Sequence, residues 1–308
     1  MTRSLLIGRI FYGFGDWIMT TAVIKMINAY RPDVSVDFII RGWRHYDLHT
    51  LPSVCGARVR LVKETDIKPS NYTWCCPHLV YSPLYMRDQA DIYGYHLEEQ
   101  MVWALNKTCP GLNLPYDPMI VARPLVPYPV PVPETPYIVV PSAGNAIKQI
   151  KERCTPTSKP KEWDGFSELA ERLAAHYPLV QVGSQVDPKL AVCTYDYRDV
   201  SYPTLSYLFL NARCVIAPEN GLSHWAGHHG VRCYTLYLSS KHARPAHAIY
   251  PRQIPIESIN TPLSVDTVYG TIMKMERFFD RKMSADTPPD KIDQWMVRRP
   301  PSGRVHVL

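Results

Sequence analysis

The sequence predicts an α/β protein with two domains, each built on a parallel sheet. Three observations lead to this prediction. The first sixty residues alternate apolar strands with a helical stripe, a proline-rich segment then interrupts every regular pattern, and the alternation starts again after it. With 308 residues, 46% of them hydrophobic, the chain is long enough for two domains of ordinary size.

The N-terminal domain, residues 1–123, begins with a strand–helix–strand unit. Apolar runs at 5–10 and 34–40 predict the strands, and the helix between them starts at Asp16. Apolar side chains recur every four residues from Ile18 to Tyr30, so this face of the helix must pack on a sheet. Further strands are expected at 59–62 and 79–81, and a further helix at 97–105.

Residues 124–136 are too rich in proline for a helix or a central strand, and they predict an extended linker between the domains. The second α/β domain is expected at 137–262, followed by a helical segment at 263–283 and a basic, partly irregular tail at 284–308. Its expected strands are 137–140, 179–182, 214–217 and 233–237, and its helices are 166–177 and 204–210, with the last helix at 265–279. Two such domains place a cleft between them, lined by strand carboxyl ends.

The turn from Glu219 to His224 is the main candidate site. It follows an apolar strand, Gly221 permits a tight reversal, and Ser223 is expected to cap a helix that opens with His224. A helix start offers N–H donors and a partial positive charge to a phosphate. The residues alone leave two interpretations open, an anion site or an ordinary capped turn.

Gly13, Gly15 and Asp16 lie between the first strand and the first helix. They form an incomplete dinucleotide fingerprint because its third glycine is missing, which disfavours a nicotinamide-dependent oxidoreductase. Asp16 is either the N-cap of the helix or a general base at a strand end.

Composition excludes several classes of protein. The net charge of +6 and the pI near 8.8 favour anionic ligands and permit nucleic acid. No apolar run reaches membrane-spanning length and no secretory signal is recognisable, so we expect a cytoplasmic protein without an integral membrane segment. Eight scattered cysteines do not indicate a disulfide framework.

No metal site is predicted. Cys75, Cys76 and His78 lack a second pair of ligands at zinc-finger spacing. His224 and His228 are four residues apart, but Trp225 stands where a zinc hydrolase has glutamate.

Five segments, in family order, resemble motifs of glycosyltransferase family 9, the bacterial heptosyltransferase family. They are the Gly-Asp, Thr-rich helix start at 14–24, the small-residue loop at 141–144, the Lys-x-Trp segment at 161–163, the strand-then-glycine loop at 182–184 and the Asp-Ser/Thr-Gly-x-x-His turn at 219–224. The resemblance implies the GT-B architecture, with two Rossmann-like domains whose parallel sheets face a central cleft. The first domain would bind the acceptor and the second a nucleotide-sugar donor.

The resemblance also implies the chemistry and its residues. It implies inverting sugar transfer from the nucleotide sugar to an acceptor hydroxyl, with no metal and no further cofactor. Asp16 matches the catalytic base. The positions that match the donor and phosphate contacts are Gly15, Ser142, Gly144, Lys161, Gly183, Glu219, Asn220, Gly221, Leu222, Ser223 and His224. From the residues alone, Lys161 is also interpretable as one of several surface lysines in its loop.

The sequence departs from the family in two places, because Glu219 replaces an aspartate and the first domain is shorter. By family analogy the acceptor is a surface glycan or a lipid-linked glycan, and the protein would then work at the periphery of the inner membrane. The basic charge and basic tail also fit a viral glycosyltransferase that modifies a hydroxylated base in DNA. A non-catalytic nucleotide-binding protein of the same fold is the remaining alternative.

Overall fold

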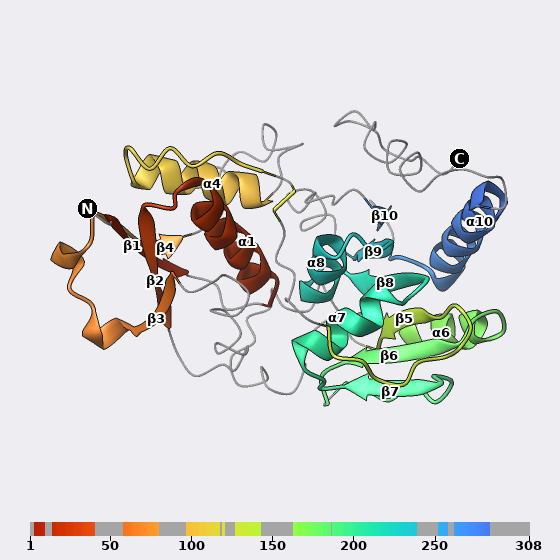
Figure 1. The fold of residues 1–308 in the computed structure, drawn as a ribbon. Coiled ribbons are helices and arrows are strands. Elements are labelled where there is room, and N and C mark those ends of the chain that lie inside the picture. The colour runs from red at the N-terminus through yellow and green to blue at the C-terminus, as the bar shows by residue number, and fades with distance from the viewer. Residues whose placement is uncertain are drawn as a thin grey trace. The chain divides into compact units, whose positions relative to one another are not determined.

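A computed structural model of the chain describes residues 3–9, 14–40, 58–79, 97–117, 119–120, 127–142, 163–185, 187–238, 252–257 and 262–283. The chain separates into two compact units, Met1–Leu125 and Val126–Leu308, whose elements are labelled in Figure 1. None of the described helices combines the length and the apolar character that crossing a membrane requires.

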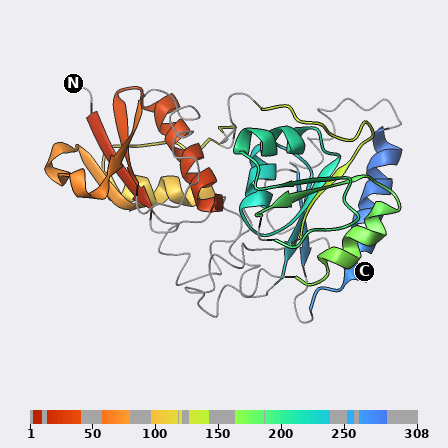
Figure 2. The ribbon, with the colours of Figure 1, turned by 90° about the horizontal axis from the view of Figure 1, so that it is seen from below.

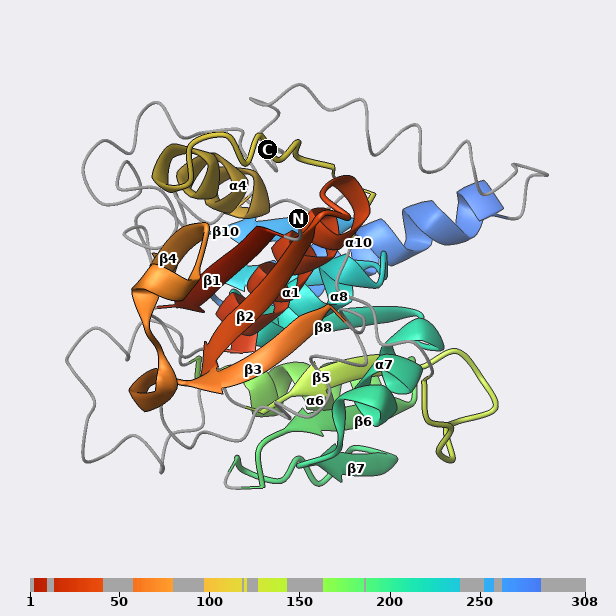
Figure 3. The same ribbon diagram turned by 60° about the vertical axis from the view of Figure 1, so that its left-hand side comes forward.

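The first unit contains a four-stranded parallel sheet with the strand order β3-β2-β1-β4 (Figure 3). Its strands are β1 (Arg3–Arg9), β2 (Val34–Ile40), β3 (Val59–Lys63) and β4 (Trp74–Leu79). Leu5 of β1 lies opposite Val36 on one side and Trp74 on the other. The chain therefore leaves β1 toward β2 and later returns to its other side, so the carboxyl ends of β1 and β4 flank a topological switch point.

Two helices accompany this sheet, α1 (Phe14–Tyr30) and α4 (Leu97–Thr108), together with the short 3₁₀ helices η1 (Glu64–Asp66) and η2 (Pro69–Asn71). The apolar stripe expected on α1 is buried from Ile18 to Met26, since Ile18, Ala22 and Met26 are at most 1% exposed, whereas Tyr30 at its end is 45% exposed. The helix packs against β2 and α4, and α4 packs against β4. Burial of this stripe confirms the sequence interpretation that it is core.

The strand expected at 79–81 begins five residues earlier in the structure, and residues 80 and 81 lie outside the described residues. The structure forms β4 from Trp74 to Leu79, so Cys75, Cys76 and His78 are strand residues. Pro77 lies inside β4, which is an edge strand of its sheet, and an edge is where a strand tolerates proline. The proline and the mixed polar character of this segment hid it in the sequence.

The second unit contains a six-stranded parallel sheet with the order β10-β9-β8-β5-β6-β7. Its strands are β5 (Ile138–Pro141), β6 (Leu179–Gly183), β7 (Tyr195–Arg198), β8 (Cys214–Pro218), β9 (Cys233–Tyr237) and β10 (Gln253–Glu257). Four of these strands were predicted; β7 and β10 were missed. β5 and β8 are central neighbours, and the chain moves from β5 toward β7 and from β8 toward β10, so their carboxyl ends flank a second switch point.

Helices cover both faces of this sheet (Figure 2). α6 (Phe166–Ala174) and α10 (Val265–Met283) lie on one face, and α7 (Tyr202–Leu210) and α8 (Gly221–His228) lie on the other. Leu169 and Leu173 of α6 and Ile272 of α10 pack with strand residues in one buried core cluster. α10 therefore completes the core of the second unit, where the sequence treated residues 263–283 as a separate segment.

The described part of the proline-rich segment, residues 127–136, has no regular secondary structure. The Tyr128 N–H donates to the Pro203 carbonyl at 3.1 Å, and the Tyr197 hydroxyl donates to the Pro131 carbonyl. Because Pro203 belongs to α7 and Tyr197 to β7, this segment lies against the second unit.

Candidate functional site

Apart from Gly15, which belongs to the first unit, the predicted donor residues that the structure describes lie at the carboxyl ends of three neighbouring strands of the second sheet. Ser142 directly follows β5, Gly183 ends β6, and the turn from Glu219 joins β8 to α8. The strand order places β8, β5 and β6 side by side. In open α/β sheets, ligands bind outside the carboxyl ends of the strands at the switch point, which here lies between β5 and β8. The topology thus brings together residues as far apart in the sequence as Ser142 and His224.

The turn after β8 is held by a capping box at the start of α8. Asn220 is the N-cap, its side chain accepts from the Leu222 N–H at 2.9 Å and from the Ser223 N–H, and the Ser223 hydroxyl accepts from the Asn220 N–H at 3.2 Å. The helix therefore begins at Gly221, and the expectation that Ser223 caps a helix opening with His224 is wrong. Asn220 takes the cap because its side chain satisfies two N–H groups of the first turn at once.

The capping box leaves few donors for a ligand. The N–H groups of Leu222 and Ser223 donate to the Asn220 side chain. The His224 N–H donates to the Asn220 carbonyl at 3.2 Å. In the described chain, the Gly221 N–H is the first-turn donor that has no acceptor. An anion at this helix start would thus meet the Gly221 N–H and the positive end of the helix dipole.

Glu219 and His224 face each other across the turn. The His224 Nε2 lies 3.5 Å from the Glu219 Oε1. The His224 side chain is 6% exposed and the Glu219 side chain is 15% exposed. The Glu219 N–H is bound to the Leu236 carbonyl at 3.0 Å, which ties the turn to β9. The longer side chain that distinguishes this sequence from the family motif therefore reaches the histidine of the same motif.

The loop after β6 is folded back on itself around Asp187. Gly183 has φ of +138°, and a Cβ there would lie 2.5 Å from the Asp187 Oδ2. The Ser184 N–H donates to that oxygen at 2.7 Å. Only glycine combines this backbone conformation with such a close carboxylate.

Asp187, which the sequence analysis missed, is 6% exposed, and its Oδ1 has no hydrogen-bond partner within the described residues. Burial raises the pKa of this carboxyl above its ordinary value, although the Ser184 N–H and the charge of Arg198 oppose the shift. A carboxylate four residues after the loop glycine was the available signal in the sequence.

In the first unit, Gly15 and Asp16 belong to the first turn of α1, the next described element after β1. The carboxyl end of β1 lies at the switch point of the first sheet. Asp16 is the third residue of the helix by backbone position, so it is not the N-cap; its side chain lies outside the described part of the structure.

Gly144 and Lys161 also lie outside the described residues, and so does the tail at 284–308. Among the residues described, no group of three or more His, Cys, Asp or Glu side chains is arranged to hold a metal ion.

No protein-family model and no curated protein matches the sequence. Solved structures nevertheless match most of the chain. The ADP-heptose LPS heptosyltransferase II of E. coli has a TM-score of 0.57 and 15% identity, over 88% of this chain and 98% of that one. The iron-containing dodecameric glycosyltransferase TibC of enterotoxigenic E. coli has a TM-score of 0.58 and 11% identity, over 89% of this chain and 79% of that one.

A glycosyl transferase of family 9 from Veillonella parvula matches with a TM-score of 0.50 and 12% identity, over 88% of this chain and 91% of that one. At these identities the match establishes the shared fold. The two parallel sheets, with their helices and strand orders, thus form an α/β architecture of the GT-B type, and the chain has the fold of the heptosyltransferases and family 9 glycosyltransferases.

Proposed function

We propose that the chain is a heptosyltransferase-like glycosyltransferase that moves a sugar from a nucleotide-sugar donor to an acceptor hydroxyl. One observation supports this most strongly. Ser142, Gly183 and the turn from Glu219 to His224, which the family resemblance assigns to the donor, all lie at the carboxyl ends of adjacent strands around one switch point. The matching fold of an enzyme named for ADP-heptose supports a nucleotide-sugar donor.

In the proposed reaction, Asp16 takes the proton of the acceptor hydroxyl, and the oxygen attacks the anomeric carbon. The bond from that carbon to the diphosphate breaks with inversion, and the nucleoside diphosphate leaves with the electron pair. The negative charge on the leaving group is stabilised by the Gly221 N–H at the start of α8, by His224 and by Lys161. This arrangement supplies the charge neutralisation that a metal ion supplies in other transferases, and we therefore propose metal-independent transfer.

The proposed acceptor is a glycan, free or lipid-linked, and its support is the fold shared with an enzyme named for LPS. Transfer to duplex DNA carrying a hydroxylated base, rather than to a glycan, would replace this part of the proposal while leaving the donor chemistry intact. Donor binding with neither transfer nor hydrolysis would identify a non-catalytic nucleotide-binding protein.

The experiment pairs binding with turnover. A panel of nucleotide sugars is screened by thermal shift, because a ligand at 100 times its Kd stabilises the folded state by about 2.7 kcal/mol. Asp16→Asn should keep the shift given by the active donor and lower the rate of transfer by about 10²–10⁴-fold, the usual contribution of a general base.

Two controls accompany this test. Addition of EDTA should leave the rate unchanged, whereas loss of activity that iron restores would replace metal independence with iron dependence; TibC is iron-containing. Full turnover by Asp16→Asn would remove Asp16 from the base role.

A further inference from the structure

Gln181 is a fully buried amide in the apolar strand β6. Its exposed fraction is 0%, and its strand neighbours Val180 and Val182 are equally buried. An amide in such a place is costly unless each of its polar atoms has a partner. The hydrogen-bond partners of the Gln181 amide therefore indicate the role of this residue.

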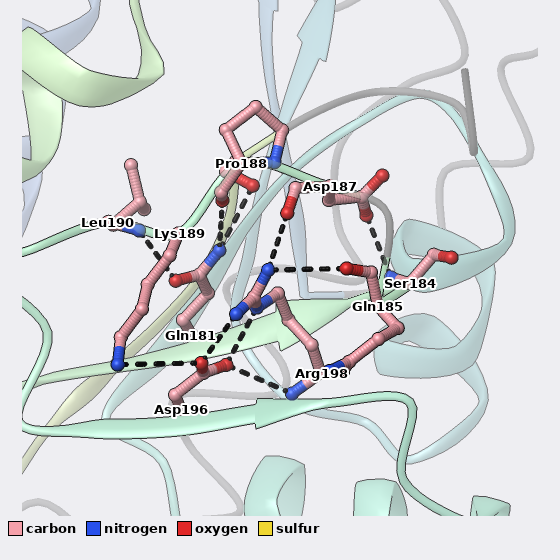
Figure 4. A network of polar contacts seen from close by, with 10 residues as sticks. Gln181, Ser184, Gln185, Asp187, Pro188, Lys189, Leu190, Asp196 and Arg198 are labelled. Atoms are coloured by element: carbon pink, nitrogen blue, oxygen red, sulfur yellow. Dashed lines mark hydrogen bonds and ion pairs between the residues drawn. The ribbon is translucent and has the colours of Figure 1, made fainter. Parts of the chain in front are cut away.

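The Gln181 side chain joins two carboxyl-end segments of the sheet, and Figure 4 shows its contacts with Pro188 and Leu190. Its Nε2 donates to the Ser142 Oγ at 3.0 Å and to the Pro188 carbonyl at 2.6 Å. Its Oε1 accepts from the Leu190 N–H at 2.8 Å. Ser142 directly follows β5, and Pro188 and Leu190 belong to the segment after β6.

The same network continues to β7. One guanidinium nitrogen of Arg198 donates to the Asp187 carbonyl at 2.5 Å, and two others bind the Asp196 carboxylate at 2.8 and 2.7 Å (Figure 4). Arg198 thus holds the residue that precedes Pro188. The segment that contains Pro188 is therefore held by Gln181 and by Arg198 together.

These partners determine the orientation of the Gln181 amide without ambiguity. The Leu190 N–H can only donate and the Pro188 carbonyl can only accept, so the amide oxygen must face Leu190 and the nitrogen must face Pro188. The second amide hydrogen then goes to the Ser142 Oγ. Ser142 receives a hydrogen from Gln181, so its own hydroxyl hydrogen must point elsewhere.

We propose that Gln181 is a positioning residue that orients the Ser142 hydroxyl as a hydrogen-bond donor to the diphosphate of the sugar donor. The inference rests on the proposed function, and it adds to that function a residue in the strand interior that acts through Ser142. Within the described chain, the Ser142 hydroxyl hydrogen has no acceptor, and Ser142 lies beside the β5–β8 switch point. A purely structural role for Gln181 would give the same fold but no coupling to Ser142.

The test is a double-mutant cycle measured by calorimetric titration with ADP, UDP and GDP. Gln181→Met keeps the volume of the side chain and removes its hydrogen bonds, and Ser142→Ala removes the hydroxyl. Each should raise the Kd of the nucleotide that binds best by about tenfold, as expected for one hydrogen bond to a charged group. The double variant should also raise the Kd by only about tenfold, because the effects of two residues that act as one unit are not additive.

Two further variants separate positioning from loss of stability. Tyr234→Phe removes a buried hydrogen bond to Glu276 near the amino ends of β8 and β9, so it should lower Tm and leave the nucleotide Kd unchanged. If Gln181→Met does not fold, Gln181→Glu keeps the shape of the side chain and an acceptor for the Leu190 N–H, and it replaces methionine in the same cycle.

An unchanged Kd in the Gln181 variant, or a hundredfold loss in the double variant, would overturn the inference while leaving the proposed function intact. Failure of the wild-type chain to bind any of the three nucleotides would instead contradict the proposed function, and the inference with it.

Discussion

Two buried aspartates of this chain have opposite electrostatic environments. Burial alone would raise the pKa of Asp37, but hydrogen bonds from Arg60 and Tyr72, together with the charge of Arg60, lower it below the ordinary value. Burial raises the pKa of Asp187, and the Ser184 N–H and Arg198 do not offset it. Asp37 therefore favours the folded state when it is charged, and Asp187 favours it when it is neutral.

The two residues should change stability with pH in opposite directions. Asp187 contributes stability below its unfolded pKa, about 3.9, and that contribution is lost as pH rises through the raised folded pKa. Asp37 contributes stability above about 3.9, which is lost as pH falls through its lowered folded pKa. Thermal unfolding between pH 3 and 8 should show the Tm of Asp187→Asn rising relative to wild type as pH increases.

Asp37→Asn provides the matched control, and its Tm relative to wild type should fall over the same range. The same slope for both variants would contradict these environments.

At the scale of single elements, the start of α8 depends on the Asn220 cap. Its side chain accepts from the Leu222 N–H and the Ser223 N–H, and its own N–H donates to the Ser223 hydroxyl. This capping box sets the position of the Gly221 N–H that the proposed diphosphate meets. The same turn therefore affects both the stability of α8 and the affinity for the donor.

Asn220→Ala should lower stability by about 1 kcal/mol, the usual cost of a lost N-cap. For a unit of this size the loss corresponds to a fall in Tm of about 2–4 °C, and nucleotide binding should weaken as well. Asn220→Ser keeps a side chain that can cap the helix and should retain most of the wild-type Tm. If the alanine and serine variants have equal Tm values, the cap contributes nothing.

The strands that the sequence missed or misplaced share a physical reason. β4, β7 and β10 are all edge strands of their sheets. β4 and β10 each contain a proline, and β7 contains Asp196 and Arg198, features that protect a sheet edge from pairing with another chain. Central strands are buried on both faces and show as apolar runs, so β5, β6, β8 and β9 were predicted nearly to the residue.

The candidate site shows the same division. The turn from Glu219 to His224 could be found because glycine, serine and histidine follow an apolar strand. Gln181 could not, because its partner Ser142 follows a neighbouring strand and is brought close only by the order of the strands. A hydrogen bond between neighbouring parallel strands leaves no periodic pattern in the sequence.

At the scale of the whole chain, the fold of the second unit depends on a buried charge cluster at the end opposite the candidate site. Glu276 of α10 is 0% exposed and binds Arg213 before β8, Arg232 before β9 and the Tyr234 hydroxyl. The Arg232 guanidinium also lies 3.7 Å from the centre of the Phe279 ring. These contacts attach the last helix to the amino ends of the central strands.

Glu276→Gln leaves two arginines without their buried counter-charge and should cost about 3 kcal/mol or more. Thermal unfolding should then show a fall in Tm of about 6–12 °C. Glu168→Gln, on the exposed side of α6, removes a surface ion pair with Arg172 and should hardly change Tm. Equal effects of the two variants would show that burial of the Glu276 cluster does not matter.

The central claim is that the sugar donor binds at the carboxyl ends of β5, β6 and β8. Amide hydrogen–deuterium exchange, with and without the nucleotide sugar that raises Tm, locates the binding site directly. We expect slower exchange at Ser142, at Ser184 and Gln185, and from Glu219 to His224, with α10 unchanged. Protection confined to other segments, with these three at their free rates, would contradict it.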